Sequence, residues 1–302
     1  MKKLGFGLMR LPRNEDGKFD IERTAKMADE FLKNGFTYFD TAYIYEGSEE
    51  TFREAIGKRQ PRDSYTLANK LPAWKIAEKS DVERIFNESL ARCGVEYFDY
   101  YLLHSIIGKA ATKHEEFGSW DFCAEMKRQG KIRNFGFSFH GDEILLEEIL
   151  TKHPEVDFVQ LQINYLDWNS SVVRAAKNYE VCRKHDKPIV IMEPVKGGQL
   201  ASFEPETEEL MKKLNPEASC ASYALRFAGT LDGVMTVLSG MSDEEQMADN
   251  ILTFSDLKPL TPDETKVIEE VRDRVLASKT VSCTACGFAD SRYNCILGLS
   301  YL

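Results

Sequence analysis

Four residues of this sequence could act together in proton transfer. Asp40, Lys70 and His104 each end a strand-like run, and Tyr45 follows Asp40 by five residues. A lysine close to a phenol would lower the pKa of the tyrosine from about 10, and Asp40 would pair with Lys70 and keep it charged. A carbonyl that accepts a hydride on carbon needs a proton on oxygen. Tyr45 could supply that proton while His104 orients the substrate oxygen.

Each of these residues also has a plainer explanation when taken alone. Asp40 could be a turn or cap residue, Lys70 a solvated loop residue, and His104 a structural histidine. The four residues fall at the ends of three neighbouring strand-like runs and on the loop after one of them. The ordered set therefore favours the catalytic interpretation over the three separate ones.

The elements that must position these residues alternate along the chain. Strand-like apolar runs are expected near 4–9 and at 36–40, 64–70, 97–104, 132–138, 157–164, 188–194 and 233–240. Helical patterns follow them at about 21–34 and at 48–59, 80–94, 117–130, 141–150, 170–185, 216–229 and 242–252, with a final helix within 253–278. Eight such units predict an α/β protein with a (β/α)8 TIM barrel. An open doubly wound sheet is the alternative, but no G-x-G-x-x-G follows any strand.

The composition indicates a globular protein with one large domain. The chain has 302 residues, of which 43% are hydrophobic, and a net charge of -10. The negative charge disfavours nucleic acid and acidic membranes as partners, and no run of eighteen apolar residues occurs. Seven scattered cysteines form no secreted disulfide framework. We therefore expect a cytoplasmic protein with a barrel and its C-terminal helix over residues 1–278 and a poorly ordered, cysteine-containing tail over 279–302. Its oligomeric state stays open.

Seven segments together resemble the aldo-keto reductase family. They cover roughly residues 4–252 and read "FDTAYIYEGSEE", "LANKLP", "DYYLLHS", "GFSFHG", "VDFVQLQINY", "IMEPVKGGQL" and "LSGMSDEEQMADNI". The resemblance implies a TIM barrel that binds NADPH or NADH across its mouth and reduces small aldehydes or ketones reversibly. It makes Asp40, Tyr45, Lys70 and His104 the catalytic tetrad, with Tyr45 as the general acid.

The same resemblance implies a set of cofactor-binding residues. Ser138 and Gln160 match ligands of the nicotinamide carboxamide, Met192 matches the residue that stacks on the nicotinamide ring, and Gly197, Gly198 and Leu200 match the pyrophosphate loop. The adenosine half would lie at Gly240, Ser242, Gln246 and Asn250. Two positions depart from the family pattern, because Phe139 stands where many members have asparagine and Met192 replaces the commoner aromatic residue.

The cysteines of the tail begin like a ferredoxin ligand run, C-x2-C-x2-C-x3-C. Cys283 and Cys286 match its first two positions, but Ala289 and Tyr293 stand at the third and fourth. We therefore predict no iron-sulfur cluster and no resident metal.

The segment 239–250 bears on the choice of nicotinamide cofactor. It has no basic residue and contains Asp243, Glu244, Glu245 and Asp249. Carboxylates near a 2'-phosphate would repel it, so we expect NADH to be accepted, with a preference for NADPH below about 100-fold in kcat/KM. The alternative is that these carboxylates only favour the start of a solvent-facing helix.

Two other functions remain open at this point. A regulatory barrel could bind the cofactor with little turnover, and a sugar hydrolase could use paired carboxylates, although Asp40 has a lysine as its expected neighbour. The substrate is not specified, because the loops at 105–120 and around 165–171 vary freely on such a barrel. Six aromatic residues near loops could line an apolar substrate pocket: Tyr43, Trp74, Trp120, Phe139, Tyr165 and Trp168.

Overall fold

The computed structural model describes residues 2–278 and forms a closed barrel of eight parallel strands. The strands pair in chain order, and β8 closes the ring against β1. They are β1 (Leu4–Gly7), β2 (Tyr38–Asp40), β3 (Thr66–Pro72), β4 (Phe98–Ile106), β5 (Ile132–Phe139), β6 (Phe158–Gln162), β7 (Ile189–Met192) and β8 (Val234–Ser239). This confirms the predicted (β/α)8 TIM barrel. The tail prediction for Cys283 and Cys286 lies outside the described residues.

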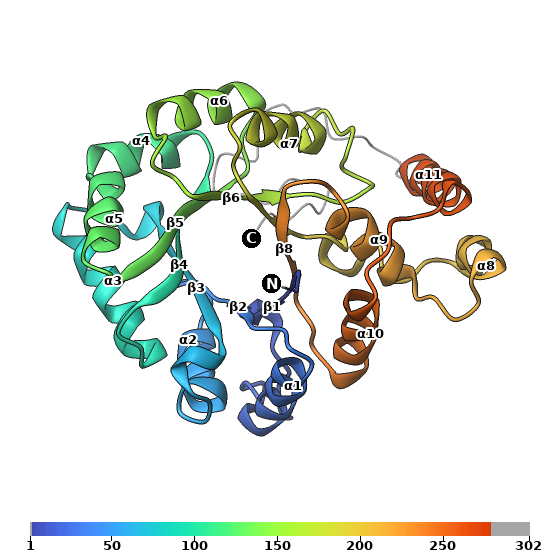
Figure 1. Cartoon of the computed structure of the whole chain (residues 1–302), viewed down its shortest axis with the longest axis horizontal. Helices are drawn as coiled ribbons and strands as arrows, with labels where there is room; N and C mark the ends of the chain where they lie inside the picture. Colours follow the sequence, from blue (N-terminus) through green and yellow to red (C-terminus); the bar gives the residue numbers. More distant parts are fainter. Residues whose placement is uncertain (1, 279–302) are drawn as a thin grey trace.

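Helices surround the barrel (Figure 1). They are α1 (Ile21–Lys33), α2 (Ser48–Phe52), α3 (Ser80–Cys93), α4 (Lys109–Glu116), α5 (Ser119–Arg128), α6 (Glu143–Lys152), α7 (Ala175–Lys184), α8 (Pro205–Leu214), α9 (Cys220–Gly229), α10 (Glu244–Ser255) and α11 (Pro262–Ser278). Helices α8 and α11 lie outside the ring beside α9 (Figure 1). An ion pair from Arg226 to Glu264, with a nitrogen–oxygen distance of 2.7 Å, ties α11 to α9. Within residues 2–278, no helix is long and apolar enough to cross a membrane.

Aromatic residues fill the lower part of the barrel interior. The rings of Tyr38 and Tyr100 lie 4.9 Å apart, and the rings of Tyr100 and Phe158 lie 5.4 Å apart. Gly136 makes room for them, since a Cβ there would lie 2.5 Å from the carbonyl oxygen of Phe158. The interior of the barrel is therefore filled with side chains below its mouth. The polar side chains that could take part in a reaction lie at the C-terminal ends of the strands.

Several helix boundaries differ from the sequence prediction. The helix expected over 48–59 is α-helical only to Phe52 and continues as a π-helical turn over Arg53–Gly57. Part of the loop after β4 folds as α4, and α8 occupies a segment where no helix was expected. The helix expected over 170–185 begins only at Ala175. These differences fall in the segments that cover the barrel, whereas each predicted strand is present.

Candidate active site

Asp40 and Lys70 form a buried ion pair at the barrel mouth. Lys70 Nζ lies 2.5 Å from Asp40 Oδ1 and also donates to the carbonyl oxygen of Thr41 at 2.8 Å. Both side chains are at most 5% exposed. Burial alone would lower the pKa of Lys70, but Asp40 and Tyr45 raise it above its ordinary value. The lysine is therefore held charged at neutral pH, as the sequence predicted.

The loop after β2 presents Tyr45 to this pair. The Tyr45 N–H donates to the carbonyl oxygen of Ala42 at 2.9 Å, and Ser48 Oγ anchors the far end of the loop on the carbonyl oxygen of Leu8 at 3.0 Å. Lys70 Nζ lies 5.0 Å from the centroid of the Tyr45 ring. The structure thus brings Tyr45 to Lys70 from a separate loop.

The pKa of Tyr45 differs from the sequence expectation. Tyr45 as a whole is only partly buried, yet desolvation of its phenol raises the pKa above the ordinary value of 10, and Lys70 is the largest opposing influence. The expected lowering by Lys70 is present, but it is outweighed by burial. The phenol consequently stays protonated at neutral pH, which suits a proton donor.

His104 completes the cluster from β4. Its ring lies edge-on to the Tyr45 ring, with 6.0 Å between centroids and 83° between planes, and the Trp74 ring lies 5.4 Å away. Burial, with a smaller contribution from Lys70, holds the pKa of His104 well below its usual range. His104 is therefore neutral, and its Nδ1 is buried and has no hydrogen-bond partner within residues 2–278. A neutral imidazole at this place can orient an oxygen without competing for the proton of Tyr45.

Ser138 and Gln160, the predicted carboxamide ligands, lie side by side on β5 and β6. They are register partners and at most 3% exposed. Ser138 Oγ accepts from the Ser105 N–H at 2.7 Å, so its own proton remains available to donate. Gln160 Oε1 is buried and finds no hydrogen-bond partner in the described part of the chain. Gln162 is occupied, since its Nε2 donates to Asp167 Oδ2 at 3.2 Å.

The loop after β7 offers an open backbone surface. Gly197 and Gly198 have φ values of 63° and 100°, and a Cβ on Gly198 would meet no atom of the described residues within 4 Å. Lys196 pins the loop to the loop after β6, because its Nζ lies 2.6 Å from Asp167 Oδ1. Met192 is half-buried at the end of β7, but the Leu200 side chain is fully buried in a separate apolar cluster. Leu200 therefore stabilises this loop by packing in that apolar cluster.

Side chains after β8 are largely engaged in local structure. Ser242 Oγ donates to the carbonyl oxygen of Arg10 at 2.8 Å, and Asn250 Nδ2 donates to Ser239 Oγ at 2.7 Å. Asp243 caps α10 by accepting from the Gln246 N–H at 2.8 Å. Asp243, Glu244 and Glu245 thus stand at the start of α10, whereas Asp249 lies within the helix and accepts from Ser219 Oγ at 2.7 Å. Gly240 remains beside the mouth.

Sequence reasoning missed Arg10, which the structure places beside the expected phosphate region. Its guanidinium donates to the carbonyl oxygen of Gly197 at 3.2 Å, and a Cβ on Gly240 would lie 3.8 Å from its side chain. Arg10 is exposed and forms no ion pair within residues 2–278. Arg23, by contrast, is neutralised by Glu244 at 2.6 Å. The position of Arg10, three residues beyond the end of β1, was the signal that could have identified it.

Among the six candidate aromatic residues, Trp74 places its ring against a catalytic side chain. Trp74 lies against the His104 ring and is 46% exposed. The other five pack elsewhere: Tyr43 on Glu88 and Arg92, Trp120 on His153, Phe139 on Phe137, and Tyr165 and Trp168 on Phe227. Strand alternation turns Phe139 outward, because Ser138 before it faces the interior.

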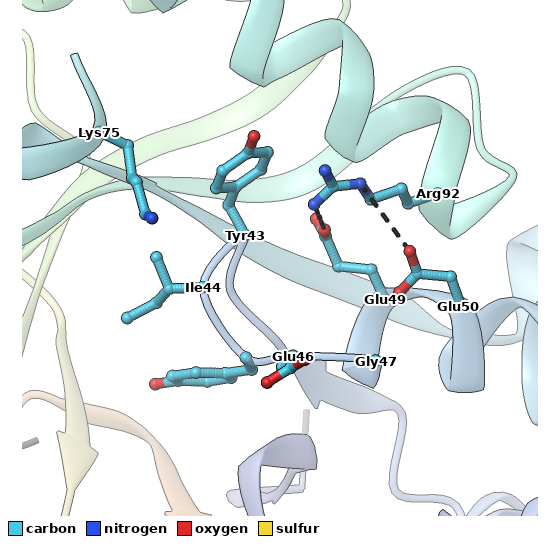
Figure 2. A pocket seen from close by; sticks show the side chains of 9 residues that line it. Tyr43, Ile44, Glu46, Gly47, Glu49, Glu50, Lys75 and Arg92 are labelled. Atoms are coloured by element: carbon cyan, nitrogen blue, oxygen red, sulfur yellow. Dashed lines mark hydrogen bonds and ion pairs between the residues drawn. The ribbon is translucent and has the colours of Figure 1, made fainter. Parts of the chain in front are cut away.

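A pocket of about 410 Å³ adjoins Tyr45 on the outer side of its loop. Figure 2 shows Lys75 on one side of Tyr43 and Arg92 on the other. Arg92 pairs with Glu49 at 3.3 Å and with Glu50 at 3.8 Å. This wall is therefore held by charged contacts.

Comparisons with known proteins identify the family. The sequence profile of the Aldo/keto reductase family matches residues 3–273. The chain is 24% identical to the Bacillus subtilis oxidoreductase YqkF, over 89% of this chain and 92% of that protein. It is 25% identical to an NADPH-dependent alpha-keto amide reductase of Saccharomyces cerevisiae, over 78% and 75% of the two chains.

Solved structures give the same fold. An aldo-keto reductase of Bacillus halodurans in its holo form superposes with a TM-score of 0.71 at 24% identity, covering 89% of this chain and 91% of that one. A Klebsiella pneumoniae aldo/keto reductase in complex with NADP and acetate superposes with a TM-score of 0.70 at 20% identity, covering 89% and 91%. The chain belongs to the aldo/keto reductase family and is an NAD(P)H-dependent oxidoreductase.

Proposed function

We propose that this protein reduces a small aldehyde or ketone to the alcohol, reversibly, with Tyr45 as the proton donor. The observation that carries the proposal is the cluster in which Lys70 lies between Asp40 and the ring of Tyr45, with His104 edge-on to the same ring. A protonated phenol next to a fixed cation is suited to release a proton as negative charge develops on a carbonyl oxygen. Small carbonyl compounds are the proposed partners, and the cytoplasm is the proposed compartment.

The residues at the mouth fit a nicotinamide cofactor. The free acceptor of Gln160 and the free proton of Ser138 complement a carboxamide, and the open backbone at Gly198 leaves room for phosphates. Met192 would pack on the nicotinamide ring through its thioether, and Arg10 would lie near the phosphates. When bound, the reduced nicotinamide supplies a hydride. The barrel over residues 1–278 is proposed to form the whole catalytic domain.

The chain's own groups perform the remaining steps. His104 orients the carbonyl oxygen toward Tyr45 Oη, and the phenol transfers its proton to that oxygen. Lys70 stabilises the phenolate that remains, and Asp40 keeps Lys70 in place. In the reverse direction the phenolate accepts the proton of the alcohol, so the two directions use one cluster.

The experiment is a cofactor titration followed by turnover. NADPH and NADH are titrated against the protein by fluorescence quenching, and a panel of aldehydes and ketones is then tested with the cofactors that bind. The proposal expects saturable binding and consumption of NADPH or NADH that depends on the carbonyl compound. Binding without turnover on any of them would instead favour a regulatory barrel.

A further inference from the structure

The last residue of β5, Phe139, lies at the mouth, but its side chain cannot bind the cofactor. Phe139 follows Ser138, and its ring packs edge-on to Phe137 at 6.1 Å, within the layer between barrel and helices. Phe139 is 1% exposed. The position that many family members fill with an amide therefore supplies no polar group here.

The next residue, His140, lies on the interior side. Successive strand residues alternate between faces, so His140 shares the face of Ser138. Its backbone N–H donates to the carbonyl oxygen of Ile106 at 3.1 Å, so pairing with β4 continues through this residue. Its imidazole lies beside the Gln162 side chain on β6. His140 is thus held between β4 and β6, beside the Ser138 and Gln160 pair.

The imidazole of His140 is neutral at physiological pH. Burial lowers its pKa to about 4, and the interaction with Gln162 only partly offsets this effect. A neutral imidazole has one donor and one acceptor nitrogen. With Gln162 beside one nitrogen, the other is left for a ligand in the mouth.

The neighbouring polar groups indicate what that ligand is. Gln160 Oε1 needs a donor, and the Ser138 hydroxyl can donate. A primary carboxamide offers two N–H donors and a carbonyl oxygen with two lone pairs. Ser138 would donate to one lone pair of the carboxamide oxygen, and Gln160 would accept from one of the two N–H groups. The second N–H and the second lone pair would remain for one further polar group of the protein.

We propose that His140 is a third ligand of the cofactor's carboxamide and takes the place of the amide that Phe139 removes. The assignment rests on the proposed function. It makes His140 a cofactor-binding residue, distinct from His104, which faces the substrate oxygen.

The test measures binding by calorimetry, with NADPH and with adenosine 2',5'-bisphosphate, a fragment that lacks the nicotinamide. His140→Ala should weaken NADPH binding about three- to tenfold, the effect of one lost hydrogen bond, and should leave the fragment unchanged. His140→Asn restores an amide and should recover most of the NADPH affinity. His185→Ala is the matched control, because His185 bonds Glu147 at 3.0 Å away from the mouth.

The outcomes separate this assignment from the proposed function. NADPH affinity unchanged in His140→Ala overturns the assignment, and so does an equal loss for NADPH and the fragment, which would indicate a distorted mouth. A rise in KM for the aldehyde alone would make His140 a substrate ligand and would also overturn it. If the unaltered protein does not bind NADPH at all, the proposed function fails first.

Discussion

Lys70 Nζ lies 2.5 Å from Asp40 Oδ1 and 5.0 Å from the centroid of the Tyr45 ring. The ammonium therefore acts on two groups at once. It neutralises a buried carboxylate, and it is the main influence that opposes the raised pKa of Tyr45. Removing it should affect both stability and catalysis.

Lys70→Met is expected to lower kcat by about 10² to 10⁴, because the phenolate loses its stabilising charge. Reduction requires a protonated Tyr45, so its rate falls as pH rises through the pKa of the phenol. Since Lys70 lowers that pKa, its loss should move the falling limb of the pH–rate profile to higher pH. The profile is measured from pH 6 upward to about 11, within the range where tyrosine titrates.

The same substitution leaves Asp40 buried without its partner. Breaking a buried ion pair costs about 3 to 5 kcal/mol of unfolding free energy, which urea denaturation measures. Lys131→Met is the matched control, because Lys131 is exposed just before β5 and bonds the carbonyl oxygen of Glu96. An unshifted falling limb in Lys70→Met would contradict the coupling of Lys70 to Tyr45.

Phe139→Asn should not create a carboxamide ligand, although it restores the residue that many family members have. The Phe139 side chain lies in the outer apolar layer, so the substitution buries an amide there and removes an aromatic ring. Loss of a buried Phe costs about 3 to 5 kcal/mol. Urea denaturation checks this value against Ile144→Asn, at a residue that is 63% exposed. Tighter NADPH binding by Phe139→Asn would show that the residue faces the cofactor.

The cofactor preference should depend on Arg10. Without basic residues in 239–250, we predict that NADH is accepted and that the preference for NADPH stays below about 100-fold. Arg10 is the exposed guanidinium beside Gly197 and Gly240, so Arg10→Gln should reduce kcat/KM for NADPH more than for NADH. Steady-state kinetics with both cofactors on one aldehyde decide this. Equal losses would indicate that Arg10 senses only the pyrophosphate, which both cofactors share.

The substrate surface should depend on Trp74. Its ring lies against His104 and is partly exposed, so Trp74→Ala should raise KM for apolar aldehydes and leave the Kd of NADPH unchanged. Trp168→Ala is the comparison, because Trp168 packs on Tyr179 and Phe227 away from the catalytic cluster. If Trp74→Ala left KM unchanged for every aldehyde, substrate would have to bind elsewhere, for example in the pocket beside Lys75.

The sequence predicted the barrel and its strand ends because buried parallel strands leave a strong apolar signal. Asp40 ends β2, and Lys70 and His104 lie two residues before the ends of β3 and β4, so all three could be identified from that signal. Tyr45 was identified by its spacing on the following loop. These four residues lie together at the mouth because the sheet closes into a barrel. The alternation of strands and helices in the sequence predicted that closure.

The other features of the site depend on side-chain packing, which the spacing of residues along the sequence does not reveal. Arg10 is remote in sequence from Gly197 and Gly240, and only barrel closure brings them together. The net direction of the Tyr45 pKa depends on how much water its phenol loses, which composition does not reveal. The helices α4 and α8 are additions to the regular alternation of one helix after each strand, so that alternation did not predict them.

The most direct test of the account is the rate of Tyr45→Phe, measured together with its affinity for NADPH. The substitution removes only the phenolic hydroxyl and should leave the Kd of NADPH within about twofold, because Tyr45 is not assigned to the cofactor. Carbonyl reduction should fall by at least about 10²-fold, the lower limit for a lost general acid. Turnover within a few-fold of the unaltered protein would contradict the assignment of Tyr45 as the proton donor.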